Sequence, residues 1–132
     1  FYMGVDPIME QNNAIYREQS RLIQEFAEKS DCVIVGRSAD YILREKHPFR
    51  LFVYAEMEHK MERCKKRAPE SEHFTDKELK RHILDVDKRR ARYYQFFTGQ
   101  TWGDRLNYDL CINTSNYDIK ELVHAIAHLV EA

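Results

Sequence analysis

The sequence DCVIVGRSADYIL, residues 31–43, determines the expected fold because a strand pattern meets a helix pattern within it. Its apolar run CVIV (32–35) is short and rich in β-branched residues, which predicts a strand buried on both faces. Gly36 and Arg37 end the run, and Ser38 is a candidate N-cap for a short helix. Ligands of parallel sheets bind outside the carboxyl ends of the strands, so an arginine at this place indicates an anion site.

On both sides of this stretch, helix and strand patterns alternate along the chain. Apolar residues at spacings of three and four predict a helix before it, and two further apolar runs predict strands after it. The predicted helices are 7–29, 56–68, 75–98 and 116–132, and the further strands lie within 49–55 and 108–115. Thr75 and Glu78 have capping-box spacing, and Gly99 can end the helix that they begin. Such alternation predicts a three-layer α/β fold with a parallel sheet.

The helix 75–98 carries an arginine where its apolar stripe predicts a core residue. A helical projection from Leu79 places Ile83 on the inward face and Arg90 in the middle of it. A buried arginine is costly unless an anion meets it, so two interpretations stay open. One is an internal ion pair with Asp87 or a snorkelling stem. The other is a cation that holds a phosphate, with Asp87 orienting it or binding ligand hydroxyls.

Further arginines give weaker signals for the same anion site. Arg63 and Arg67 share one flank of the helix 56–68, while Arg89 and Arg92 lie off the apolar stripe of the next helix. Solvated surface charge is the ordinary interpretation of all four, and closure over a transferred phosphoryl group is the alternative. For Arg37 the alternative to an anion site is a structural ion pair, with Asp40 as the nearest candidate.

Composition excludes several classes of protein. A chain of 132 residues with 43% hydrophobic and 33% charged residues fits one domain, and a net charge of -1 argues against a dedicated nucleic-acid coat. Cys32, Cys64 and Cys111 have no zinc-site spacing, and the histidines form no metal set, so we expect reduced thiols and no metal ligands. Without a signal peptide or a long apolar run, we expect a cytoplasmic protein that does not span a membrane.

Three segments in order resemble the cytidylate-kinase-like family of P-loop kinases: CVIVGRSADYIL, FRLFVYAEMEHKMERCKKR and DKRRARYYQFFTGQTWGDRLNYDLCINTS. The resemblance implies the fold of the P-loop nucleoside monophosphate kinases, a five-stranded parallel sheet with helices on both faces and strand order 2-3-1-4-5. It also implies an ATP-dependent transferase that moves the γ-phosphoryl group of ATP, with Mg²⁺, to CMP or a related monophosphate.

The resemblance further assigns roles to residues at matching positions. A Gly-Arg-Asp motif of the family binds the acceptor nucleotide; Arg37 matches it, Ser38 stands in place of the aspartate, and Asp40 is the candidate substitute. An Asp-x-x-Arg motif of the family contacts acceptor sugar and phosphate, and Asp87 with Arg90 has its spacing. The family's lid arginines, which approach the transferred group, correspond to Arg63, Arg67, Arg89 and Arg92.

The chain departs from the family in one large respect: it contains four glycines and no GxxxxGK[ST] motif. In the family this loop follows the first, central strand and supplies the backbone N–H groups that hold ATP phosphates. We therefore expect residues 1–132 to be a single domain truncated at its N-terminus, in which the residues present do not by themselves support ATP or Mg²⁺. We expect one of three arrangements. The central strand lies in an N-terminal portion outside residues 1–132, another chain supplies it, or the remaining elements repack without it.

These observations favour two hypotheses for the function. The first is a nucleoside monophosphate kinase when intact, with ATP and a monophosphate as partners and homo-oligomerisation open. The alternative is a non-catalytic nucleotide-sensing or interaction module of the same fold. Nucleic-acid binding through the basic helix segment 77–92 is less favoured, because acidic residues interrupt its surface.

Overall fold

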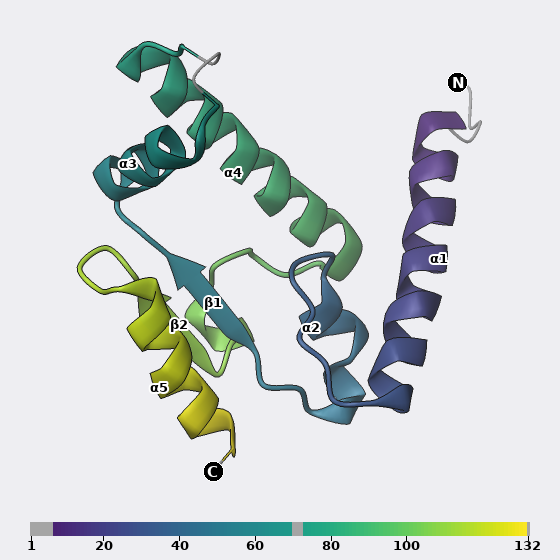
Figure 1. The fold of residues 1–132 in the computed structure, drawn as a ribbon. Coiled ribbons are helices and arrows are strands. Elements are labelled where there is room, and N and C mark those ends of the chain that lie inside the picture. The colour runs from purple at the N-terminus through teal and green to yellow at the C-terminus, as the bar shows by residue number, and fades with distance from the viewer. Residues whose placement is uncertain (1–6, 70–72, 132) are drawn as a thin grey trace. The chain divides into compact units, whose positions relative to one another are not determined.

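The computed structural model describes residues 7–69 and 73–131, which divide into two compact units that meet between Pro48 and Phe49 (Figure 1). The first contains α1 (Pro7–Lys29), α2 (Ala39–Ile42) and the short 3-10 helix η1 (Arg44–Lys46). The second contains β1 (Leu51–Tyr54), α3 (Met57–Arg67), α4 (Asp76–Thr98), the 3-10 helix η2 (Arg105–Asn107), β2 (Leu110–Asn113) and α5 (Ile119–Glu131).

The first unit is held by a small apolar cluster between α1 and α2. Ile23 on α1 is buried with Ala39 and Leu43, and Ile34 packs against them from the connecting segment. The α1 bounds confirm the helix predicted over 7–29. An exposed ion pair between Glu28 and Lys46 contributes little beside this apolar contact.

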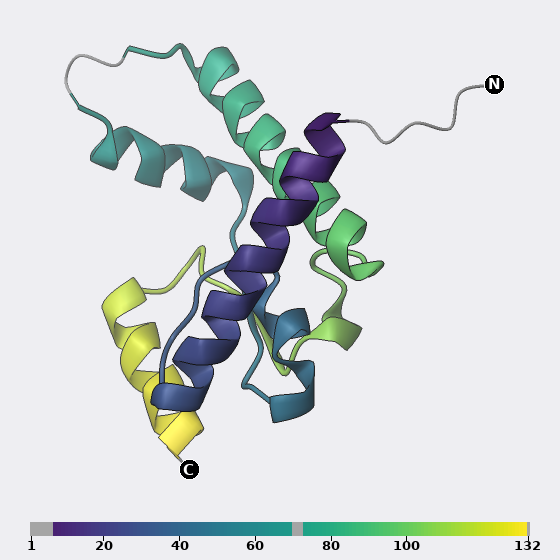
Figure 2. The same cartoon turned by 90° about the vertical axis from the view of Figure 1, so that its right-hand side faces the viewer.

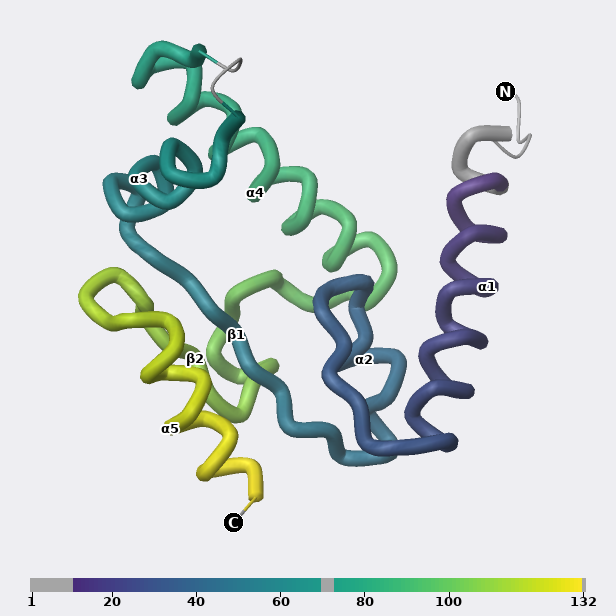
Figure 3. Tube along the Cα trace, in the orientation of Figure 1, coloured from purple at the N-terminus to yellow at the C-terminus, as the bar shows by residue number. Residues whose placement is uncertain are grey.

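The predicted strand 32–35 is wrong: the structure has no strand between α1 and α2. Val33 and Val35 are 94% and 88% exposed, and Figure 3 shows the segment as a non-helical trace between α1 and α2. A strand forms only where a neighbour pairs its backbone N–H and C=O groups. Within the described residues the segment has no such neighbour, so its β-branched side chains have no sheet to pack into.

The second unit contains a parallel pair of strands in the register Leu51–Leu110 to Tyr54–Asn113. This confirms a mixed α/β chain with a parallel sheet, although the described residues form two strands rather than the three predicted from the sequence. The ring of Phe52 packs against Trp102 and Tyr108 on one face of the pair. A Cβ on Gly103 would meet that ring at 3.2 Å, and this residue has φ 83, so the position requires glycine.

Helices α3 and α4 form a hairpin, and the longer helix, α4, begins and ends as predicted. The Thr75 hydroxyl accepts the Glu78 N–H at 3.2 Å, and the Glu78 carboxylate accepts the Thr75 N–H at 3.4 Å, which completes the capping box. At the other end Gly99 is left-handed (φ 72) and donates its N–H to Gln95. The buried stripe of α4 consists of Leu79, Ile83 and Tyr94.

The last helix, α5, is confirmed, but most of its predicted inner face is open. Ile119, Val123 and Val130 are exposed, and only Leu122 and Ile126 of this face are half-buried. Figure 2 shows α5 as the final element after β2. None of the described helices has both the length and the apolar character needed to cross a bilayer.

Asp109, just before β2, makes polar contacts with Arg50, just before β1. The strength of these contacts depends on pH. The Asp109 carboxylate accepts the backbone N–H of Arg50 at 2.7 Å and lies 3.4 Å from the Arg50 guanidinium. The backbone hydrogen bond first, and then the guanidinium, lower the pKa of the Asp109 carboxyl below its ordinary value. The stabilisation is therefore complete above the unfolded-state pKa, about 3.9, and is lost as pH falls through the lower folded pKa.

We expect Asp109→Asn to reduce the free energy of unfolding at pH 7 by less than about 1 kcal/mol, because the pair is partly exposed. The deficit should shrink as pH falls below about 4, where the native carboxylate is protonated as well. Urea titrations between pH 7 and pH 3 measure both quantities. A deficit that stays constant over this range would contradict the role given to the charge.

Candidate functional site

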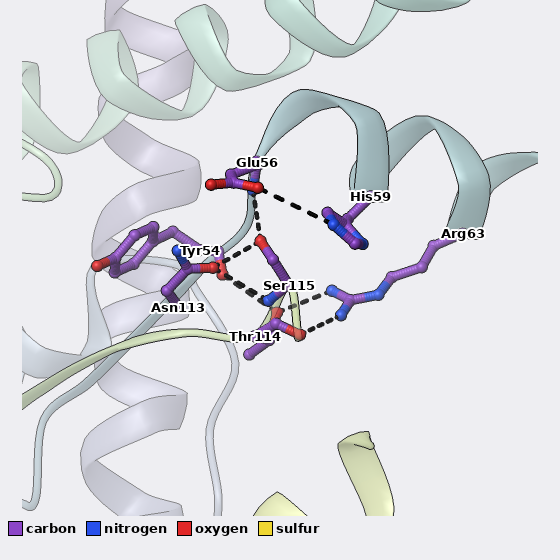
Figure 4. Close-up of polar contacts among 7 residues, drawn as sticks. All are labelled: Tyr54, Glu56, His59, Arg63, Asn113, Thr114 and Ser115. Atoms are coloured by element: carbon purple, nitrogen blue, oxygen red, sulfur yellow. Dashed lines mark hydrogen bonds and ion pairs between the residues drawn. The ribbon is translucent and has the colours of Figure 1, made fainter. Parts of the chain in front are cut away.

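A polar cluster lies where β1 and β2 end, at the carboxyl edge of the parallel pair (Figure 4). We call it the strand-end cluster. Its members are Tyr54, Glu56, His59, Arg63, Asn113, Thr114 and Ser115. Thr114 and Ser115 are buried, so their hydroxyl groups depend on protein partners. This edge is where parallel α/β sheets bind ligands.

Thr114 connects three elements of this cluster. Its side-chain hydroxyl lies 3.1 Å from the carbonyl of Tyr54 and accepts a hydrogen bond from Arg63 at 2.8 Å. A second guanidinium nitrogen of Arg63 donates to the Thr114 carbonyl at 2.6 Å. The Thr114 N–H also donates to the Tyr54 carbonyl, at 2.9 Å. The guanidinium thus fixes α3 to the end of the strand pair.

Ser115 makes a second contact with α3, at its N-terminal end. Its hydroxyl accepts the Glu56 N–H at 2.9 Å and donates to the Asn113 side chain at 2.6 Å. Glu56 occupies the N-cap position of α3, where a free N–H group needs an acceptor. The side chain of His59 lies 3.9 Å from the Glu56 carboxylate on the same turn. The start of α3 is therefore built onto residues 113–115.

A second charged group lies across the α3–α4 hairpin and is centred on Asp87. One carboxylate oxygen of Asp87 lies 2.8 Å from the Lys60 ammonium, and the other lies 3.3 Å from the Arg90 guanidinium. The Asp87–Arg90 pair left open by the sequence therefore exists. The expected burial of Arg90 in the apolar stripe is wrong, because its side chain is 64% exposed. The guanidinium reaches solvent and the Asp87 carboxylate together.

The remaining predicted lid residues are less constrained than Arg63. Arg67 ends α3 and is exposed, as are Arg89 and Arg92 on α4. A guanidinium is weakly hydrated, so exposed arginines on one hairpin can approach an anion at a small cost in desolvation. Their predicted role at a transferred phosphoryl group stays a prediction.

In the first unit, three successive residues, Gly36, Arg37 and Ser38, are left-handed with φ 71, 58 and 57. For Arg37 and Ser38 this conformation is strained, since only glycine adopts it freely. Ser38 precedes α2 without a side-chain cap bond, so the predicted N-cap is wrong in its hydrogen bonding. Its side chain is buried, and its hydroxyl has no partner within the described residues.

Arg37 and Asp40 carry the acceptor-site prediction in this unit. Arg37 is exposed in the segment between α1 and α2, and Asp40 is half-buried at the start of α2. Because Arg37 and Arg90 belong to different units, their convergence on one pocket stays a prediction.

The sequence missed Lys60, Thr114 and Ser115 as site residues. The polar run NTS directly after an apolar strand was an available signal for the last two, because side chains at strand ends meet at one edge of a parallel sheet. No local pattern indicated Lys60, because its partner Asp87 lies on another helix. No group of three or more potential metal ligands occurs in the described part of the chain.

Comparisons with known proteins place this geometry in context. The sequence model described as "Cytidylate kinase-like family" matches residues 3–116. A crystal structure titled as an uncharacterized protein from Eubacterium ventriosum is similar, with a TM-score of 0.81 and 27% sequence identity. The similarity covers 92% of this chain and 74% of that one. No curated protein matches this chain.

Proposed function

The chain belongs to the cytidylate kinase-like family, and from that premise we propose that it serves phosphoryl transfer from ATP to CMP or a related nucleoside monophosphate. The match over residues 3–116 carries the proposal, because it includes both compact units up to the end of the strand-end cluster. The parallel strand pair and the charged groups at its carboxyl edge agree with an α/β nucleotide-binding fold of the P-loop kinase type.

The acceptor half of the reaction is assigned to cations that the chain keeps accessible. Arg37 and Arg90 bind the acceptor phosphate, Asp87 orients Arg90, and Asp40 receives a hydroxyl or base group. Phosphoryl transfer needs little covalent work from a protein, so positioning and neutralisation of charge supply most of the catalysis. Arg67, Arg89 and Arg92 are the mobile cations of a lid in this scheme, while Arg63 is held at the strand ends.

The ATP-binding part of the reaction has no assigned residues in this chain. The sequence has no GxxxxGK[ST] motif, and the described residues form no group of three metal-ligating side chains.

The test is calorimetric titration of the full-length protein with CMP, UMP, AMP and GMP, followed by an assay of ADP release with ATP and Mg²⁺. We expect saturable binding of at least one pyrimidine monophosphate and ADP release that depends on it. Binding without ADP release would favour the alternative, a nucleotide-sensing module of this fold. Failure of every monophosphate to bind would overturn both and would leave an interaction module of the same fold.

A further inference from the structure

Lys60 makes the most buried charged contact of the α3–α4 hairpin among the ion pairs of the described residues. Its ammonium and the Asp87 carboxylate lie 2.8 Å apart, with side chains 32% and 22% exposed. A further ion pair between these helices, Lys65 with Asp76, lies at their exposed ends. Exposed pairs contribute little, so Lys60 with Asp87 is the principal polar contact that fixes one helix against the other.

The two oxygens of Asp87 are divided between two cations. Lys60 takes Oδ2 at 2.8 Å, and Arg90 takes Oδ1 at 3.3 Å. The inner position therefore belongs to the lysine, and the arginine is left with one longer contact on the outer side. A guanidinium has five N–H donors, so Arg90 keeps donors for a further anion.

The charges of this trio favour an anion at Arg90. Two cations around one carboxylate leave a net charge of about +1, whereas Asp87 and Arg90 alone would cancel. Because Lys60 also fixes the direction of the carboxylate, the Arg90 guanidinium is held at one end while its other end stays open. Helix α3 is itself fixed to the strand ends through Arg63, one turn after Lys60.

We propose that Lys60 is a positioning residue that acts through Asp87 to hold Arg90 ready for the phosphate group of a nucleoside monophosphate. The inference rests on the proposed function and deepens it. Asp87 is then an orienting group shared by two cations. Lys60 itself touches no substrate.

The experiment compares three variants by calorimetry with the monophosphate that the unmodified protein binds. Lys60→Met keeps the aliphatic stem and removes the charge, Lys60→Arg restores a cation, and Lys66→Met is the control. Lys66 lies on the same helix in an exposed pair with Glu62. We expect Lys60→Met to raise the dissociation constant about three- to tenfold. Lys60→Arg should recover most of that loss, and Lys66→Met should leave the constant unchanged.

Lys60→Met in an Arg90→Gln background shows whether Lys60 acts by positioning Arg90 or only by stabilising the fold. If Lys60 acts through Arg90, Lys60→Met has little further effect on binding once Arg90 is gone. Equal losses in both backgrounds, or no loss in the unmodified one, would overturn the proposal while monophosphate binding persists. Absence of monophosphate binding by the unmodified protein would instead overturn the proposed function, and the role of Lys60 with it.

Discussion

Arg90→Gln is expected to weaken binding of a nucleoside monophosphate by about ten- to a hundredfold. A hydrogen bond to a charged group is worth about 1.5–3 kcal/mol, and the guanidinium supplies the charge as well as the donors. Glutamine retains the length of the stem and a donor but loses the charge. Since Arg90 is exposed and makes one long contact with Asp87, its removal should leave the free energy of unfolding nearly unchanged. Calorimetry and urea denaturation of the same variant measure the two effects.

Arg81→Gln is the matched control, because Arg81 is an exposed arginine on the same helix. A loss of binding in Arg81→Gln as large as that in Arg90→Gln would show a diffuse charge effect instead of a site. Low salt enlarges diffuse effects, so the comparison belongs at physiological ionic strength.

The double variant Arg37→Ala with Arg90→Ala tests whether the two arginines serve one phosphate. If they share it, the two losses are coupled, because the second cation compensates in part for the first. Strictly additive losses would indicate two separate contacts with the nucleotide. No loss in the double variant would refute the assignment of both residues.

Local sequence signals predicted the helices well, because their determinants lie within a few residues. The Thr75–Glu78 capping box and the left-handed Gly99 set both ends of α4 without help from the rest of the chain. The segment CVIV shows the opposite case. Its β-branched residues are necessary for a buried strand but not sufficient, since pairing depends on a neighbour elsewhere in the fold.

The site could be predicted only as far as single residues reveal their chemistry. Asp87 and Arg90 are three residues apart on one helix, so their pairing could be anticipated from the spacing. The contacts of Lys60 with Asp87 and of Arg63 with Thr114 join residues 27 and 51 positions apart. Such partners are chosen by packing of the hairpin and the strand pair, which no local pattern encodes. The helical projection misplaced Arg90 for a related reason: it assumed a core on a side of α4 that is open at that turn.

Thr114→Val is expected to lower the free energy of unfolding of the second unit by about 1–3 kcal/mol. The side chain is 2% exposed, and its hydroxyl accepts from Arg63 and lies 3.1 Å from the Tyr54 carbonyl. Valine has nearly the same shape but leaves one guanidinium donor of Arg63 without its acceptor in a half-buried place. An unsatisfied partner costs more than the lost hydrogen bond alone, and for a charged donor the cost is at the upper end.

Two further variants identify the source of that loss. Thr114→Ser keeps the hydroxyl and should lose less than about 1 kcal/mol, whereas Arg63→Met removes the donor itself. If the hydroxyl acts mainly on Arg63, Thr114→Val has a smaller effect in the Arg63→Met background, and urea denaturation gives the coupling free energy directly. Equal effects in both backgrounds would place the role of Thr114 in its contact with β1. In that case the contact between Ser115 and Glu56 would be the main link between α3 and the strand ends.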